Sequence, residues 1–352
     1  MKIDEDPDGL MLDGDSSKSS GKTMPLTKVT IRDVARVAGV SPSTVSRALA
    51  RPGRVSASTA KRILEVADRM GYHNDAVETV PLRHSTGMVA VIVPDLANQF
   101  FSDAIHAVQR ECHRENMAVV IAESLENATQ EFEAFNKFVP YVDGVVIASS
   151  RMPDAMIRKC AQMRPVVVTN RVVRGVESVA LDITPGVDQL AEYLSSMGFE
   201  RVTYIDGPAS SWSVGTRWCA FSQACANRHL AVRRLWPGMP TYEGGFSFAR
   251  RYLEDPTGAV VAHNDMMAAG FIAAMRRRGY ECPKDFVIAG FDNDVIAQIT
   301  QPTLTSVRQP ASLMGSRAAR KLMQRIKGEP SDAAADSLYT SLVVRESTGL
   351  TS

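Results

Sequence analysis

A short basic segment contains the residues of this sequence with the clearest capacity to bind another molecule. Residues 28–74 carry nine Lys and Arg against three Asp and Glu, a net charge of +6, whereas the formal net charge of the whole chain is +1. The first 27 residues carry three Lys against six Asp and Glu, a net charge of −3. A compact basic module beside a near-neutral remainder is typical of a head that binds a polyanion. A basic face that is merely solvated is the alternative.

Three short helices are predicted inside the basic segment. Thr30 is placed to cap a first helix, which ends at Gly39 because glycine tolerates a positive φ. Ser41 caps a second helix with Pro42 at its first position, and residues 56–70 form a third. Short helices joined by a glycine-containing turn predict a helix-turn-helix domain. The outward face of the second helix displays Ser43, Thr44, Ser46 and Arg47.

Further motifs follow the basic segment in a fixed order. After VTIRDVARVAGVSPSTVSRALARPGRVSASTAKRILEVADRMGY come VIVPDLANQFF, DGVVI, VVVTNR, HNDMMAAG, FVIAGFDN and PTLTSVRQP. This series resembles the lactose repressor/galactose repressor family of bacterial transcription regulators over residues 28–348. The resemblance implies a sequence-specific repressor of carbohydrate-related genes, with double-stranded operator DNA and a small-molecule effector as partners.

The resemblance also implies which residues contact DNA. The second helix would enter the major groove from Pro42 onward, with Pro42, Ser43 and Arg47 at the positions that read bases. The Arg47 guanidinium can donate two hydrogen bonds to O6 and N7 of guanine. Short hydroxyl side chains near a helix N-terminus suit phosphate contacts, although Thr44 and Ser46 could instead only solvate the helix. The complete set of expected DNA-binding residues is Thr30, Ser41, Pro42, Ser43, Thr44, Ser46, Arg47 and Arg54, followed by Pro81 and Leu82 in the hinge.

The hinge is the segment 74–85. In the family it becomes helical on operator binding, and a side chain wedges into the minor groove and kinks the DNA. Counting from Tyr72 places the wedge position at Pro81, with Leu82 one residue later. Because a proline prevents a continuous helix through this point, the wedge is Pro81 or Leu82, or the protein kinks DNA weakly.

The fold class expected is multidomain: an all-α head (28–73), then a two-lobed α/β body (86–352) with parallel sheets. The runs MVAVIVPD, AVVIAES, GVVIAS, VVVTN, VTYIDG, AVVAH and FVIAGFDN predict buried strands that alternate with helices. The resemblance implies lobes like those of periplasmic sugar-binding proteins. Lobe one would comprise about 86–182 and 293–327, and lobe two about 183–292 and 328–352. The chain would then cross between lobes near Asp182, Asp292 and Lys327.

Ligands of parallel sheets bind beyond the carboxyl ends of the strands. Residues there that match the family's effector contacts are Asp95, Phe100, Phe101, Asn170, Arg171, Ser211, Ser213, Arg217 and Asp265. Asp265 can accept hydrogen bonds from paired hydroxyl groups while Arg217 donates to them, which favours a sugar or a sugar derivative. The alternatives are a structural ion pair of Asp265 with Arg217 and a core position for Phe101.

Pro240 departs from the family pattern. This position matches an aromatic platform that precedes a Glu-x-Gly-aromatic stretch, which lies here at residues 243–246. Without a ring there, a purine effector is less favoured than a sugar or sugar acid. Trp212, Trp236 or Tyr242 could supply the missing ring.

The sequence lacks the patterns that are typical of other classes of protein. There is no G-x-S-x-G elbow, no glycine-rich phosphate loop with lysine and no H-E-x-x-H, so neither an enzyme nor a cofactor is predicted. The absence of a long apolar run or a secretory signal predicts a cytoplasmic protein without membrane contact. The five cysteines are interpreted as buried free thiols. An activator, or a small-molecule-binding protein without a DNA function, stays open.

The expected assembly is a homodimer, because one helix-turn-helix reads too few base pairs for specificity. No leucine heptad follows Thr348, which argues against tail-linked tetramers. The acidic residues 1–27 are expected to be disordered, and both Met1 and Met24 stay open as translation starts.

Overall fold

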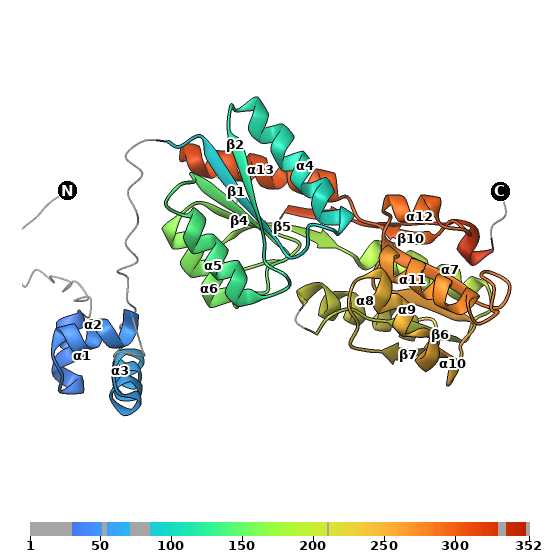
Figure 1. Cartoon of the computed structure of the whole chain (residues 1–352), viewed down its shortest axis with the longest axis horizontal. Helices are drawn as coiled ribbons and strands as arrows, with labels where there is room; N and C mark the ends of the chain where they lie inside the picture. The colour runs from blue at the N-terminus through green and yellow to red at the C-terminus, as the bar shows by residue number, and fades with distance from the viewer. Residues whose placement is uncertain (1–29, 51–54, 71–84, 210, 330–335, 350–352) are drawn as a thin grey trace, which may run out of the picture. The chain divides into compact units, whose positions relative to one another are not determined.

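The computed structural model describes residues 30–50, 55–70, 85–209, 211–329 and 336–349. The chain forms two compact units, Met1–Val77 and Glu78–Ser352, called here the head and the body (Figure 1).

The head contains the three helices α1 (Ile31–Ala38), α2 (Pro42–Ala50) and α3 (Ala57–Arg69). α1 ends at Gly39, whose φ of 66° lies in the left-handed region that favours glycine. Apolar residues at helical spacing from all three helices meet in one small core: Val34, Ala35, Ala38, Val45, Ala48, Ile63, Val66 and Ala67. The predicted helix-turn-helix architecture is confirmed.

The body contains two six-stranded sheets, one in each lobe. The first has the strand order β11-β5-β4-β3-β1-β2 and the second β12-β10-β9-β8-β6-β7. All neighbours pair in parallel except β10 and β12, which are antiparallel. The strands of the first sheet are β1 (Met88–Val93), β2 (Ala118–Glu123), β3 (Gly144–Ala148), β4 (Val166–Thr169), β5 (Glu177–Asp182) and β11 (Asp336–Tyr339). Those of the second are β6 (Arg201–Ile205), β7 (Ala231–Leu235), β8 (Ala259–Ala262), β9 (Val287–Asp292), β10 (Thr305–Arg308) and β12 (Ser341–Val343).

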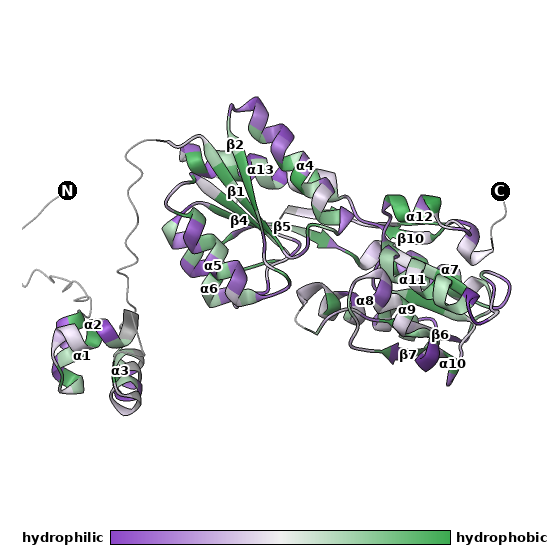
Figure 2. Ribbon diagram, viewed as in Figure 1, coloured by the Kyte–Doolittle hydropathy of each residue, from purple (hydrophilic) through white to green (hydrophobic). Residues whose placement is uncertain are grey.

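Helices cover both faces of each sheet. On the first sheet, α4 (Gln99–Arg114) and α13 (Ala311–Lys327) pack against Val89 and Val91 of β1, while α5 (Ala128–Phe138) and α6 (Asp154–Met163) pack against Ala90 and Ile92. Successive strand residues point to opposite faces, so a strand covered on both sides must be apolar throughout. In Figure 2 the strands β1 and β4 are coloured as hydrophobic, whereas hydrophilic residues lie on α4 and α5.

The second sheet is built in the same way. The helices α7 (Thr184–Ser196) and α8 (Trp212–Ala226) cover one face. The other face is covered by α9 (Tyr242–Ser247), α10 (Ala249–Leu253), α11 (Asp265–Arg276) and α12 (Val295–Ile299). A short 3-10 helix, Glu346–Thr348, lies against β9 and β10. The predicted two-lobed α/β body with parallel sheets is confirmed.

The chain crosses between the lobes three times. It leaves the first sheet after β5, returns between β10 and α13, and crosses again between β11 and β12. The predicted second and third crossings, near Asp292 and Lys327, are therefore wrong. They lie instead between Arg308 and Ala311 and between Tyr339 and Ser341. Both errors have one cause: β10 and β11 are four-residue strands with mixed polarity, too short to give a period that sequence reasoning detects.

Two further expectations concern membrane-spanning segments and the cysteines. No described helix is long and apolar enough to cross a membrane. Cys112, Cys160 and Cys225 are buried free thiols, as expected, but Cys219 is exposed and Cys282 is half-buried.

Candidate functional site

The outward face of α2 is polar because its apolar residues point inward. Val45 and Ala48 are buried in the head, whereas Ser41, Pro42, Ser43, Ser46 and Arg47 are exposed and Thr44 is half-buried. The Ser41 hydroxyl caps the helix by accepting a hydrogen bond from the Thr44 amide at 3.2 Å. The helix N-terminus therefore presents hydroxyl groups to an incoming phosphate.

Arg47 is the only guanidinium on this face of α2 within the described residues. Its Nε donates to the Ser43 carbonyl at 3.2 Å, so the side chain lies along the helix without a carboxylate partner. A guanidinium held only by its own helix is free to turn toward the edge of a base. The helix thus brings together two of the predicted base-reading residues, Ser43 and Arg47.

Thr30 has a structural role in the head as well as its predicted contact with DNA. Its hydroxyl donates to the Asp33 carboxylate at 2.6 Å and its amide donates to the same oxygen at 3.0 Å, which fixes the start of α1. Asp33 also pairs with Arg36. The predicted DNA contacts Arg54, Pro81 and Leu82 lie outside the described residues, as does the acidic segment 1–27.

The body contains a polar cavity between its lobes. This cavity is called the polar chamber. Both lobes contribute side chains, and most of these are amides, hydroxyls or paired charges. Its lining residues are Asn98, Phe100, Phe101, Glu126, Ser149, Arg151, Asn170, Pro208, Ser211, Ser213, Arg217, Pro240, His263, Asn264 and Asp292.

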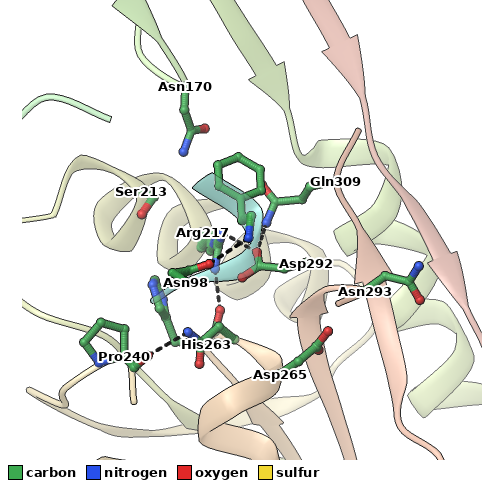
Figure 3. Close-up of polar contacts among 12 residues, drawn as sticks. Asn98, Asn170, Ser213, Arg217, Pro240, His263, Asp265, Asp292, Asn293 and Gln309 are labelled. Carbon is green, nitrogen blue, oxygen red and sulfur yellow. Dashed lines mark hydrogen bonds and ion pairs between the residues drawn. The ribbon is translucent and has the colours of Figure 1, made fainter. Parts of the chain in front are cut away.

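Arg217 and Asp292 form the buried ion pair of the polar chamber (Figure 3). The guanidinium lies 3.0 Å from the Asp292 carboxylate, and the exposed fractions of the two side chains are 6% and 3%. Arg217 also donates to the His263 carbonyl, and the Gln309 amide donates to Asp292. A buried pair held by extra hydrogen bonds keeps a fixed orientation, so it can present charged hydrogen-bonding groups to a ligand.

Three helix N-termini meet at the polar chamber. Asn98 caps α4 by accepting from the Phe100 amide at 2.9 Å, and Asn264 caps α11 by accepting from the Met267 amide at 2.9 Å. Ser211 precedes α8. Because each helix follows a strand of a parallel sheet, the sheet order itself brings these caps to the carboxyl ends of the strands.

Most of the predicted effector residues line this cavity or its neighbour. Phe100, Phe101, Asn170, Ser211, Ser213 and Arg217 line the polar chamber. Arg171 lines an adjoining cavity, where its guanidinium pairs with Asp154 at 2.5 Å and donates to backbone carbonyls.

Asp95 and Asp265 lie outside both cavity linings. Asp95 accepts from the Ala97 amide at 2.8 Å and so shapes the turn before α4. Asp265 is fully buried, and it accepts from the Ser306 hydroxyl at 2.7 Å and from the Asp294 amide at 2.9 Å. Burial, with the nearby Asp292 charge, raises the pKa of Asp265 well above its usual value. The alternative of an Arg217–Asp265 ion pair is wrong, because Arg217 pairs with Asp292.

Sequence reasoning missed seven polar residues of the polar chamber, Asn98, Glu126, Ser149, Arg151, His263, Asn264 and Asp292, and also Gln309 of the adjoining cavity. Asp292 is the last residue of β9, which was predicted as a strand, so the rule that pointed to Asp265 would also have found it. Asn98 and Asn264 are recognisable as helix caps. Gln309 follows β10, which was not predicted as a strand. In the described part of the chain, no group of three or more His, Cys, Asp or Glu residues could hold a metal ion.

The raised pKa of Asp294 leads to a prediction of how the stability of the body varies with pH. Burial, followed by the charges of Asp292 and Asp103, raises the pKa of Asp294 from 3.8 to about 8. The folded protein holds this proton more tightly than the unfolded chain does. The stabilisation that protonated Asp294 contributes is therefore fully present below about pH 4 and is lost as pH rises toward 8. We expect Asp294→Asn to flatten the fall in Tm between pH 5 and 8, measured by thermal denaturation. Asp255→Asn, at an exposed ion pair, is the control and should leave the slope unchanged; an unchanged slope for Asp294→Asn would contradict this assignment.

Comparisons with known proteins cover almost the whole chain. Residues 30–75 match the family model "Bacterial regulatory proteins, lacI family", and residues 191–348 match the model "Periplasmic binding protein-like domain". The ribose operon repressor of Halalkalibacterium halodurans is 30% identical over 328 residues, which cover 91% of this chain and 97% of that protein. The chain belongs to the LacI family. It is a DNA-binding transcription regulator and not an enzyme.

Other transcription regulators match over a similar length. The repressor CytR of Escherichia coli (strain K12) is 29% identical, covering 92% of this chain and 97% of that protein. The structure of a CelR–cellobiose complex has a TM-score of 0.69 and 27% identity, covering 91% of this chain and 99% of the other. A Lac repressor dimer bound to operator has a TM-score of 0.68 at 23% identity, covering 92% and 99%, and supports the fold alone.

Proposed function

We propose that this LacI-family protein is a cytoplasmic, homodimeric repressor of carbohydrate-related genes, whose affinity for operator DNA is controlled by a sugar or sugar derivative bound between the lobes. The observation that carries this proposal is the coexistence of a polar α2 face on the head with a buried Arg217–Asp292 pair between the lobes of the body. The α2 face contacts the DNA bases, and the Arg217–Asp292 pair forms hydrogen bonds with hydroxyl groups of the effector.

The head supports the DNA-binding part of the proposal. α2 exposes Ser43, Ser46 and Arg47, and its N-terminus carries the Ser41 and Thr44 hydroxyl groups. Phosphate contacts from such hydroxyls fix the register on the duplex, whereas a guanidinium adds base discrimination. Either Pro81 or Leu82 in the hinge is proposed as the wedge into the minor groove; if neither acts as the wedge, the protein kinks DNA only weakly.

The polar chamber supports a ligand rich in hydroxyl groups. Arg217 supplies donors, Asp292 supplies acceptors, and Asn170 and Asn264 supply both. Several of these side chains are oriented by their own partners: Asn264 donates to the Pro240 carbonyl at 2.9 Å and Asn170 donates to Ser149 at 2.9 Å. Preorganised groups of this kind lose little entropy when a polyol binds.

The effector is expected to stabilise the full chain against heat. A ligand present at about 100 times its Kd adds about 2.7 kcal/mol to the free energy of unfolding. Thermal denaturation should therefore single out a few compounds from a panel of sugars, sugar acids, nucleobases and nucleosides. Binding should weaken by about tenfold or more in Asn264→Ala, while Asn227→Ala, at the distant end of α8, serves as the matched control. Stabilisation that is equal in the two variants would argue against the polar chamber as the site.

A dimer is expected in solution. α12 exposes Val295 and Ile299, whose side chains are 50% and 68% exposed, and apolar side chains so exposed on one short helix are typical of an interaction surface. Sedimentation equilibrium at micromolar concentration should give a dimer, and Ile299→Asp should shift it toward the monomer. A monomeric wild type or a stable tetramer would contradict this expectation.

Transcription distinguishes a repressor from an activator. If the protein represses, deletion of its gene raises expression of the genes whose operators it binds; if it activates, expression falls. A reporter fused to a bound promoter measures this directly.

A further inference from the structure

The acidic residues at the start of the chain are concentrated in one short stretch. Residues 4–15 contain six Asp and Glu and no Lys or Arg, which gives twelve residues a net charge of −6. The match to the DNA-binding family model covers residues 30–75, so that comparison assigns this stretch no role. A block of like charges is typical of a segment that binds a surface of opposite charge.

The three helices of the head offer a surface of the opposite charge. Five exposed basic side chains have no ion-pair partner among the described residues, whereas Arg36 pairs with Asp33. All three helices contribute to this set, called the basic surface: Arg32 from α1, Arg47 from α2, and Lys61, Arg62 and Arg69 from α3. Because like charges repel one another, an acidic partner lowers the electrostatic free energy of the basic surface.

The acidic stretch is close enough in sequence to reach any part of the basic surface. Fourteen residues separate Asp15 from Thr30, and a chain of that length spans up to about 50 Å. The longest helix of the head, α3, has 13 residues and is about 20 Å long. A short tether gives the group that it carries an effective concentration of about a millimolar. The acidic stretch therefore meets the basic surface of its own chain more often than that of another molecule at micromolar concentration.

The distribution of charge favours the helices of the head over the body as the partner of the acidic stretch. Residues 28–74 carry a net charge of +6, whereas residues 75–352 carry −2. DNA is the competitor for the same surface, and its charge density is high, with one negative charge per about 1.7 Å of helix axis. DNA can therefore displace the acidic stretch, but it has to pay the free energy of that contact.

We propose that residues 4–15 bind the basic surface of the same chain and compete there with the phosphates of DNA. Binding of DNA releases counterions, and displacement of the acidic stretch takes up some salt ions again. The full chain therefore binds DNA less tightly than a chain without the stretch, and its affinity falls less steeply with salt. The contact acts as a built-in competitor that is strongest at low ionic strength.

Removal of the acidic stretch tests the competition. The full chain and a chain of residues 24–352 are titrated by fluorescence anisotropy against a labelled duplex of random sequence. At 0.02 M NaCl the shorter chain should bind about fivefold or more tightly, and at 0.3 M, where the Debye length is about 6 Å, the two should agree within about twofold. Equal affinities at 0.02 M, or a difference that persists unchanged at 0.3 M, would overturn the inference.

Neutral substitutions separate the charge of the stretch from its length. A full-length variant with Asp4→Asn, Glu5→Gln, Asp6→Asn, Asp8→Asn, Asp13→Asn and Asp15→Asn should bind the duplex like residues 24–352. The matched control replaces the four serines at positions 16, 17, 19 and 20 by Asn, which changes no charge, and should bind like the wild type. Wild-type affinity in the first variant, or an equal gain in both, would contradict a role for the carboxylates.

Crosslinking without DNA distinguishes contact with the basic surface from simple repulsion of DNA. A carbodiimide joins a carboxylate to an amine only where the two groups touch, and Lys61 is the basic surface's lysine. In the full chain at 0.02 M NaCl, mass spectrometry should find crosslinks between residues 4–15 and Lys61, and an excess of the random duplex should reduce them about fivefold or more. Their absence would overturn the inference, even if removal of the stretch changes the affinity for DNA.

Discussion

Arg217→Ala is expected to lower the free energy of unfolding of the body by about 3–5 kcal/mol. The substitution leaves the Asp292 carboxylate, which is 3% exposed, without its ion-pair partner, and an uncompensated buried charge is strongly destabilising. The stacking of the guanidinium on the Phe291 ring, at 4.9 Å, is lost as well. Urea denaturation of the full chain, followed by far-ultraviolet circular dichroism, measures the change.

A surface ion pair provides the control for this prediction. Arg201 pairs with Asp255 at 2.7 Å, but both side chains are 50% exposed, so water screens the interaction. Arg201→Ala should therefore cost only a small fraction of what Arg217→Ala costs. Similar losses in the two variants would mean that the Arg217–Asp292 pair is not the buried pair described above.

Arg47→Ala is expected to abolish discrimination at one base pair in each half-site of the operator. A bidentate contact of arginine with guanine contributes about 1–3 kcal/mol of discrimination, which corresponds to a factor of roughly 5 to 150 in relative affinity. Non-specific, salt-sensitive binding should be largely retained, because it depends on phosphate contacts made by other residues. Competition gel shifts with operators substituted at each position measure the effect.

Arg36→Ala serves as the matched control in the head. Arg36 lies on α1, where it pairs with Asp33, and is not part of α2. Its loss should weaken binding to all DNA sequences alike, without relaxing any single position. If Arg47→Ala and Arg36→Ala had the same pattern across the substituted operators, the assignment of α2 as the recognition helix would be wrong.

Local sequence signals predicted the head and the two sheets well. The ends of the first two helices were predictable because Thr30 and Ser41 are typical N-cap residues and Gly39 is a typical C-cap residue. The apolar residues of α2 also recur at helical spacing. β1 is apolar throughout, and β9 is free of charged or polar side chains up to its last residue, Asp292, because helices cover both faces of each strand. These features depend on residues close together in sequence, so the sequence alone specifies them.

The errors come from long-range organisation. β10 and β11 have four residues each, and their place in the sheets depends on pairing with β9 and β5. Which carboxylate faces the cavity also depends on this pairing: Asp265 lies against Ser306 of β10, whereas Asp292 lies at the strand end beside Arg217. Both are aspartates beside a strand end, so residue type and position in sequence could not distinguish the buried one from the one that lines the cavity.

The most direct test of the central claim is a binding titration of the full chain on DNA. Duplexes selected from the genome of its own organism, and scrambled versions of the same composition, are titrated by fluorescence anisotropy at 0.15 M salt. The account predicts that the selected duplexes contain two-fold related half-sites, bind about 10³-fold or more tightly than the scrambled ones, and change affinity about fivefold or more when a ligand that stabilises the body is added. Equal affinity for selected and scrambled duplexes, with or without that ligand, would contradict it.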